Sequence, residues 1–144
     1  MNDILTPAVF TLESLSEGQS VALDFLITEK DMSQFASLSG DFNPLHVDDT
    51  FARAKGFSGV VVYGGLIIAH ISRLIGMNLP GRDSLWSSID VKFRNPLYVN
   101  QTAMLEAVIS AISSATGLIE LKISLRSGNK LIAKGKAEVL LVNP

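Results

Sequence analysis

Cysteine is absent from this chain of 144 residues, and histidine occurs only twice. Without cysteine the chain has no disulfide framework, no thiolate nucleophile and no cysteine-bound metal. The absence is also typical of proteins in a reducing compartment, so we predict a cytoplasmic location. No histidines are spaced as a metal pair, and no glycine-rich phosphate loop or Gly-x-Ser-x-Gly motif occurs. The sequence therefore favours neither dinucleotide binding nor serine-hydrolase chemistry.

Long runs of charge are missing as well. The 12 Lys and Arg and the 14 Asp and Glu give a net charge of −2, and they are scattered along the chain. A nucleic-acid-binding protein needs a concentrated basic surface, so we predict that nucleic acid is not a partner. Recognition of a phosphate by one or two cations stays open. Arg82, Lys92 and Arg94 are candidates for it, although a solvated surface explains them equally well.

The most hydrophobic stretch, residues 60–76, is too short and too polar to cross a membrane. It is interrupted by polar side chains such as His70 and Arg73, whereas a spanning helix needs about 20 largely apolar residues. The first residues, MNDILTPAVF, carry an acidic side chain where a secretory signal has positive charge. We therefore expect no membrane partner, and the length predicts a single domain over residues 1–144.

The spacing of apolar residues predicts a helical first half and a sheet-forming second half. Residues 21–27 predict one early strand, and Thr28 with Asp31 forms a capping-box pattern for a helix that ends at Gly40. Residues 66–75 are apolar on nearly every side and predict a buried helix. Period-two alternation then predicts four strands, at residues 84–93, 102–111, 118–126 and 131–142. Helices on one face of an antiparallel sheet make an α+β domain, with the sheet curled about the buried helix.

The stretch at residues 39–46, SGDFNPLH, places an aspartate and a histidine five positions apart around Asn-Pro. On a continuous helix this spacing would turn Asp41 and His46 about 140° away from each other, so a bend is needed to bring them together. Pro44 supplies one, because it pushes Asn43 out of the helical region. Asp and His held together can move a proton onto and off water or a substrate carbon. The same residues are also ordinary turn formers, and spacing alone leaves both interpretations open.

The triplet Tyr63-Gly64-Gly65 stands where the buried helix begins. A helix N-terminus offers unpaired N–H donors and the positive end of a dipole. Glycines let a ligand carbonyl come close, so this point could stabilise an oxyanion. A tight strand-to-helix turn explains the two glycines as well. His70, within the apolar helix, is better explained as a core or interface residue than as a base.

Three segments together closely resemble the MaoC-like dehydratases, also called (R)-specific enoyl-CoA hydratases or hydratase 2. They are FASLSGDFNPLHVDDTFA, VVYGGLIIAHIS and SSIDVKFRNPLYVNQT, and the resemblance covers nearly the whole chain. It implies a hot dog fold, in which a curled antiparallel sheet wraps around one long central helix. It also implies a homodimer whose two sheets join edge to edge, with active sites near the subunit boundary.

For the site, the resemblance implies an acid/base pair acting on a trans-2-enoyl thioester of CoA or of acyl carrier protein. Asp41 and His46 would activate water for addition to the double bond, or run the reverse dehydration. The Gly64 backbone N–H would bind the thioester oxygen. The resemblance also implies substrate-binding and loop-supporting positions, namely Gly65, Tyr63 and Ser72 for the substrate and Asn43 and Pro44 for the loop. Such chemistry requires no metal and no redox cofactor.

Two positions depart from the family pattern. The family usually has His where this chain has Tyr63, which affects the polarity of the pocket and the choice of substrate. The usual Gly-Asp is replaced by Asn100-Gln101, which we expect to affect only a turn before a strand. Two alternatives share the fold: a hot dog acyl-CoA thioesterase, and a non-catalytic module that binds acyl thioesters.

Overall fold

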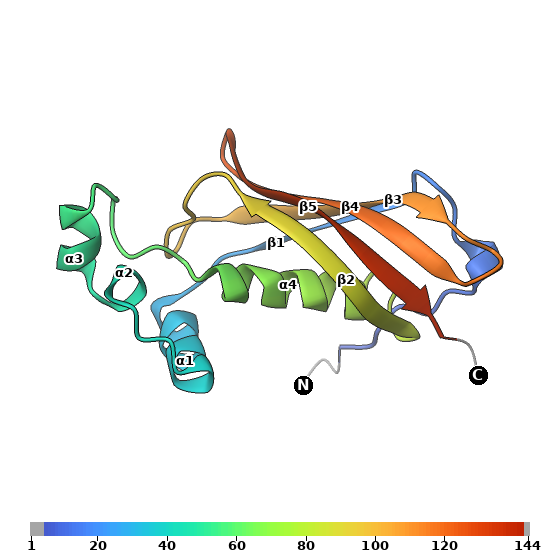
Figure 1. The fold of residues 1–144 in the computed structure, drawn as a ribbon, viewed down its shortest axis with the longest axis horizontal. Coiled ribbons are helices and arrows are strands. Elements are labelled where there is room, and N and C mark those ends of the chain that lie inside the picture. The colour runs from blue at the N-terminus through green and yellow to red at the C-terminus, as the bar shows by residue number, and fades with distance from the viewer. Residues whose placement is uncertain (1–4, 143–144) are drawn as a thin grey trace.

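Five antiparallel strands form one curled sheet, and a long helix lies along one of its faces (Figure 1). The computed structural model describes residues 5–142, so the first four and last two residues of the predicted domain lie outside the described part. The strands are β1 (Ser20–Phe25), β2 (Ser84–Phe93), β3 (Ala103–Ile112), β4 (Leu118–Ser127) and β5 (Lys130–Leu141), in the spatial order β1-β3-β4-β5-β2. The α+β hot dog architecture expected from the sequence is confirmed.

Alternation along the strands builds the core. On β3 the side chains of Leu105, Ala107 and Ile109 are buried, and the residues between them point to the outer face. On β4, Leu121 and Ile123 do the same. Because successive side chains on a strand point to opposite faces, this pattern gives the sheet one apolar face to cover with a helix.

The helix α4 (Gly64–Met77) covers that face, as the apolar run predicted, but it is less enclosed than its composition suggests. Ile67, Ile71 and Leu74 are buried against the sheet, whereas Ala69 and Ser72 on the opposite face are exposed. Small residues raise the apolar count of a helix yet expose little hydrophobic area. The sheet therefore covers one side of α4 in the single chain.

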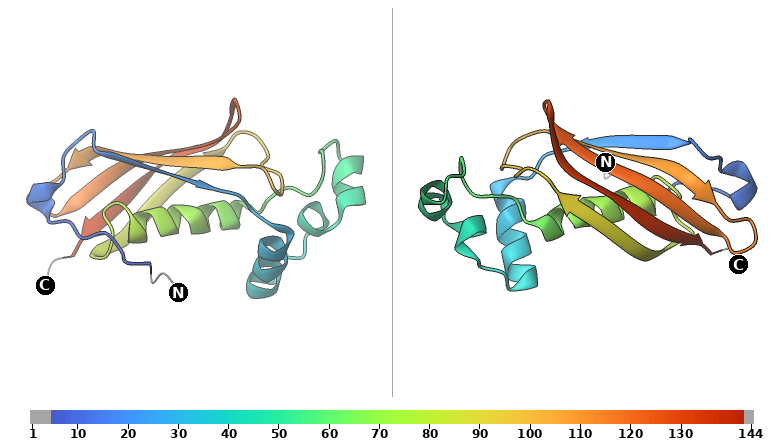
Figure 2. Two further views of the ribbon diagram at one scale, coloured as in Figure 1. Left: turned by 180° about the vertical axis from the view of Figure 1, so that it is seen from behind. Right: turned by 45° about the horizontal axis from the view of Figure 1, so that its top comes forward.

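Three further helices stand together beyond one end of the sheet, as both views of Figure 2 show. They are α1 (Glu29–Ser39), α2 (Pro44–Val47) and α3 (Asp49–Ala54), and a single 3-10 turn at Leu12–Ser14 precedes β1. The predicted capping box is present on α1, where the Thr28 hydroxyl accepts from the Asp31 N–H and the Asp31 carboxylate accepts from the Thr28 N–H. Gly40 ends this helix in the left-handed region, at φ 74°. Because these helices lie outside the sheet, side chains on them are free to form a site.

The strand β2 is an edge strand, and three of its apolar side chains are exposed. Leu85, Ile89 and Phe93 are 57%, 37% and 49% exposed, although their alternation predicts a half-buried strand. β2 pairs only with β5, so the other edge of β2 has no neighbouring strand among residues 5–142. An apolar edge strand is normally covered by another chain or element.

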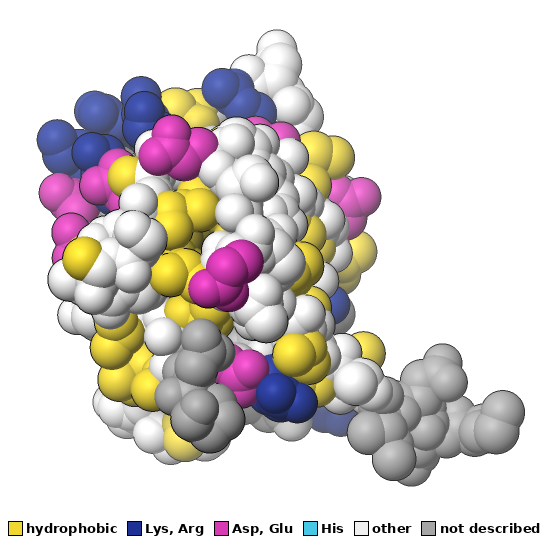
Figure 3. Space-filling view, turned by 90° about the vertical axis from the view of Figure 1, so that its right-hand side faces the viewer, with side chains coloured by type: hydrophobic (Ala, Val, Ile, Leu, Met, Phe, Trp, Pro, Cys, Tyr) yellow, Lys and Arg dark blue, Asp and Glu magenta, His cyan; other side chains and the backbone are white. Residues whose placement is uncertain are grey.

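Positive charge gathers on the outer face of the sheet. A groove of about 630 Å³ there is lined by Lys92, Arg94, Lys122, Arg126, Lys134 and Lys136. Figure 3 shows Lys and Arg side chains gathered at the top of the molecule. The groove thus holds half of the 12 cationic side chains of a chain whose net charge is −2.

The second histidine, His70, packs flat on β1. Its ring lies 4.0 Å from the ring of Phe25 at an angle of 3°. Its Nδ1 atom is buried and has no hydrogen-bond partner among residues 5–142. Burial lowers the pKa of His70, repulsion from Arg73 lowers it further, and Asp31 opposes the shift. His70 is therefore a packing residue, as the sequence suggested, and one that folds better when neutral.

We expect His70→Phe to stabilise the fold, and increasingly so as the pH falls. A lowered pKa means that the unfolded chain takes up the proton first, so wild-type stability is lost as the pH falls below the ordinary value of 6.5. Phenylalanine keeps the stacking on Phe25 and removes an unpaired polar atom. We expect this to raise the free energy of unfolding by about 1 kcal/mol at pH 7. Denaturant unfolding between pH 7 and 5 measures the difference. Equal pH slopes for wild type and variant would contradict this account.

Candidate active site

Three successive hydrogen bonds between side chains and the backbone shape the loop that follows α1. The Ser39 hydroxyl accepts from the Asp41 N–H at 3.1 Å, and the Asp41 carboxylate accepts from the Asn43 N–H at 3.0 Å. Asn43 in turn accepts from the Leu45 N–H at 3.0 Å and caps α2. Each polar side chain bonds the backbone two residues on, which is the turn-forming habit of these residues. The loop is therefore rigid for local reasons.

Pro44 does more than bend the chain. Asn43 is extended, at φ −54° and ψ 127°, as expected for a residue before proline. Pro44 itself starts the four-residue helix α2, because the first helical position needs no N–H donor. His46 therefore lies on a helical turn, where the sequence predicted only a bend. Residues 39–46 therefore both form a turn and position the side chains of a candidate site.

The imidazole of His46 is held in one tautomer. Its Nδ1 lies 2.6 Å from the carbonyl oxygen of Val61. A carbonyl can only accept, so Nδ1 carries the proton and Nε2 of the neutral ring keeps its lone pair. The ring is half-buried. His46 thus presents a nitrogen that can accept a proton from water.

Tyr63 contacts both members of the predicted pair. Its hydroxyl donates to the backbone carbonyl of Asp41 at 2.6 Å, and its ring stacks on His46 at 4.2 Å. Only 1% of Tyr63 is exposed. Within residues 5–142, no hydrogen bond or ion pair joins Asp41 to His46 directly. The structure brings the two together through Tyr63, a contact that sequence reasoning missed because it joins positions 22 residues apart.

His46 and Gly64 line one cavity of about 360 Å³. Phe93 and Arg94 contribute to the same wall. His46 also borders a second cavity of about 480 Å³, which runs between α1 and α3 and includes Phe42. Asp41 itself is exposed at the surface of the loop. Of the predicted acid/base pair, His46 is thus the member that lines the cavity at the predicted oxyanion position.

The start of α4 has the free donors that the sequence predicted. Tyr63 occupies the N-cap position but makes no side-chain cap bond, so first-turn N–H groups stay available beside a positive dipole end. A Cβ atom on Gly64 would lie 3.1 Å from the Phe93 ring, so glycine leaves room there. At Gly65 a Cβ would lie 2.7 Å from Phe35. Gly65 therefore serves packing against Phe35, and its predicted contact with substrate stays a prediction.

Two other predicted positions are also placed. Ser72 lies on the exposed face of α4 and does not line the cavity of His46 and Gly64. The Asn100 departure falls in the turn before β3, where Asn100 has φ 65°. Asparagine tolerates this left-handed conformation better than most residues. The departure therefore changes only a turn, as expected.

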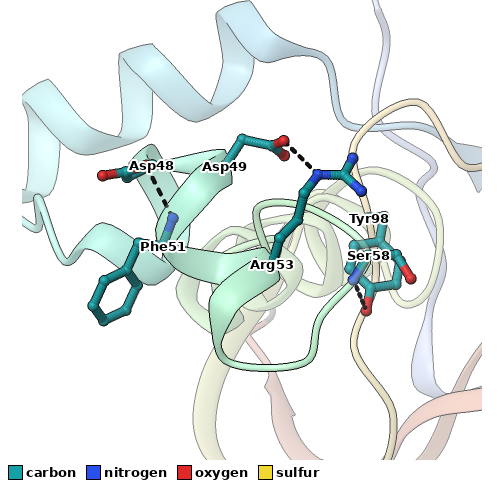
Figure 4. A network of polar contacts seen from close by, with 6 residues as sticks. All are labelled: Asp48, Asp49, Phe51, Arg53, Ser58 and Tyr98. Carbon is teal, nitrogen blue, oxygen red and sulfur yellow. Dashed lines mark hydrogen bonds and ion pairs between the residues drawn. The ribbon is translucent and has the colours of Figure 1, made fainter.

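A polar network anchors the segment between α3 and α4 (Figure 4). Asp48 caps α3 by accepting from the Phe51 N–H at 3.1 Å, and Arg53 pairs with Asp49 at 2.6 Å. The Arg53 guanidinium lowers the pKa of Asp49. The Tyr98 hydroxyl accepts from the Ser58 N–H at 3.1 Å. These contacts fix the chain that leads to Val61, whose carbonyl orients His46.

No group of three His, Asp or Glu side chains between residues 5 and 142 is placed to hold a metal ion. In the same part of the chain, no helix is long and apolar enough to cross a membrane.

Comparisons with known proteins agree with this geometry. The chain matches the MaoC like domain over residues 14–127. An (R)-specific enoyl-CoA hydratase from Aeromonas caviae is 32% identical over 130 residues, which cover 90% of this chain and 97% of the relative. A mitochondrial 3-hydroxyacyl-[acyl-carrier-protein] dehydratase from Arabidopsis thaliana is 28% identical over 122 residues, covering 82% and 72%.

A solved structure gives the same result in three dimensions. The (R)-hydratase from A. caviae, described as involved in PHA biosynthesis, matches with a TM-score of 0.86 and 31% sequence identity. The match covers 90% of this chain and 99% of that one. The domain match includes the loop with Asp41 and His46 and the start of α4. The chain belongs to the MaoC-like domain family.

Proposed function

We propose that this protein is a hydro-lyase that adds water reversibly to trans-2-enoyl thioesters and forms (R)-3-hydroxyacyl thioesters. One observation carries the proposal: His46, with its tautomer fixed by Val61, lines the same cavity as Gly64 at the N-terminus of α4. A proton acceptor and an oxyanion donor then face one substrate. The similarity to hydratases and dehydratases supports the same reaction.

The chemistry follows from these positions. Asp41 and His46 hold a water molecule, and Nε2 of His46 takes its proton as the oxygen bonds to C3 of the enoyl group. The electron pair of the double bond moves toward the thioester oxygen, where the Gly64 N–H and the helix dipole stabilise the negative charge. The proton that His46 took from water is then passed to C2, which completes the addition and returns the imidazole to its neutral form. Dehydration is the same path reversed, and no metal or redox cofactor takes part in this proposal.

Hydration of crotonyl-CoA tests the proposal. We expect the absorbance of the conjugated thioester to fall on addition of enzyme, and chiral analysis of the product to give the (R) isomer. Release of free CoA with the double bond intact would instead identify a thioesterase. Binding of crotonyl-CoA without either reaction would identify a non-catalytic acyl-thioester module.

We also propose a homodimer joined through β2. The exposed side chains of Leu85, Ile89 and Phe93 and the unpaired edge of the strand support it. Phe93 touches the Gly64 position as well, so pairing along β2 would place the site near the subunit boundary. Light scattering in solution tests this, and the mass of one chain would contradict it.

The carrier of the acyl group is proposed to be anionic, either CoA or acyl carrier protein. Arg94 lines both the cavity of His46 and the basic groove on the sheet. A cation at this junction suits the phosphates that both carriers bring. Comparing crotonyl-CoA with the crotonyl carrier protein separates the two. The cytoplasmic location stays a prediction from the sequence.

A further inference from the structure

We infer that Tyr63 is a positioning residue, which holds the Asp41 loop, the His46 ring and the start of α4 in one rigid unit. The inference rests on the proposed function for its effect on rate, but the contacts that carry it are independent of any substrate. Tyr63 stands where the family pattern has histidine, so the arrangement is a property of this chain.

The first contact fixes the backbone of Asp41. The Tyr63 hydroxyl donates to the Asp41 carbonyl oxygen at 2.6 Å, which is a short bond for an O–H donor. Asp41 directly follows Gly40, whose φ of 74° turns the chain out of α1. The Asp41 carboxylate is also bonded, to the Asn43 N–H. With the peptide and the side chain both tied, the carboxylate has one direction in which to point.

The second contact fixes the plane of the imidazole. The rings of Tyr63 and His46 lie 4.2 Å apart at an angle of 27°. The bond that sets the tautomer of His46 comes from Val61, two residues earlier on the same segment. Residues 61–63 therefore supply both restraints on the ring. Because Tyr63 is also the N-cap of α4, the oxyanion donor at Gly64 is placed by the next peptide along.

The tyrosine is itself held in place. The Phe35 ring also packs against it, tilted by 47° with ring centroids 4.7 Å apart, and only 1% of Tyr63 is exposed. Burial, together with the charge of Asp41, raises the pKa of Tyr63 above its usual value of 10.0. The hydroxyl therefore stays protonated and stays a donor at neutral pH. A histidine here could keep the stack on His46, but it lacks the phenol oxygen that reaches Asp41.

The decisive variant is Tyr63→Phe, which removes one oxygen and keeps the rings. We expect kcat for crotonyl-CoA hydration to fall about 10- to 100-fold with little change in KM, since small misplacements of catalytic groups have effects of this size. Tyr63→His should lose as much rate. Ser84→Ala is the control: it removes a half-buried hydroxyl that donates to the Gly81 backbone carbonyl at 2.7 Å, away from the site, and it should keep the wild-type kcat.

NMR measurements on the protein without substrate test this inference separately from the proposed function. In nitrogen NMR spectra, the His46 ring of wild type should show one tautomer, protonated on Nδ1. In Tyr63→Phe the His46 signals should broaden, and the amide protons of residues 40–46 should exchange faster, while the melting temperature stays close to that of wild type. Wild-type kcat in Tyr63→Phe, or unchanged spectra and exchange, would overturn the inference. Absence of hydration by wild-type protein would overturn only the proposed function.

Discussion

Asp41→Asn and His46→Asn are each expected to lower kcat by about 10²–10⁴-fold, which is the usual contribution of a positioned acid or base. Asparagine at position 41 can still accept from the Asn43 N–H, so the loop keeps its bond while the carboxylate charge is lost. At position 46 the variant lacks the Nε2 lone pair that lines the cavity with Gly64. Initial rates with crotonyl-CoA measure both losses.

The matched control for this pair is Asp48→Asn. Asp48 is an exposed carboxylate two residues after His46, and it caps α3. Asparagine is an equally good cap, so rate and melting temperature should both match wild type. If Asp41→Asn stays within twofold of wild type, Asp41 is not the acid or base. If both site variants are folded and fully active, the site lies elsewhere.

Gly135→Ala is expected to give a large loss of stability, with the free energy of unfolding reduced by about 3 kcal/mol. A Cβ atom at Gly135 would overlap the Asp90 carbonyl oxygen and lie 3.0 Å from the Val91 Cα on β2. Both contacts are with backbone, which cannot rotate aside, so the β2–β5 pair must separate locally. Overpacking of this kind costs about 1–3 kcal/mol and occasionally more. Denaturant unfolding measures the change.

Gly76→Ala is the control for the same chemical change. Gly76 lies within α4, and nothing comes within 4 Å of the Cβ it would gain. Alanine is the better helix former by about 1 kcal/mol, so this variant should be more stable than wild type. Changes of opposite sign in the free energy of unfolding of the two variants would show that the backbone contact, and not the added methyl group, destabilises Gly135→Ala. Losses of equal size would contradict that explanation.

Local signals in the sequence predicted most of the fold. Thr28, Asp31 and Gly40 define both ends of α1, because a cap and a left-handed stop act within one helical turn. The alternation in residues 84–93 gives β2 its observed bounds. The other predicted strands differ from the observed ones by one or two residues, which is the usual uncertainty at element ends.

What the sequence could not predict depends on distant partners. The bond from Tyr63 to Asp41 joins two segments that only the fold brings together. The alternation of apolar and polar residues in β2 predicted one covered apolar face. Whether a strand lies at the edge of the sheet depends on the order in which the strands pair, and that order places β2 at an edge. Pro44 was expected to bend the chain, and its role as the first residue of α2 depends on the cap that Asn43 provides.

The candidate acid and base lie on a segment that hardly takes part in the sheet. Between the end of β1 and the start of β2, one isolated bridge, from Val61 to Tyr98, has β geometry, and α1 to α3 stand beyond the strands. We therefore expect substitutions of the exposed residues in this segment to leave the strand register unchanged. Over evolutionary time, this separation would let selection on the acid/base loop act apart from selection on the folding of the sheet. A lineage could then change the loop without passing through an unfolded ancestor.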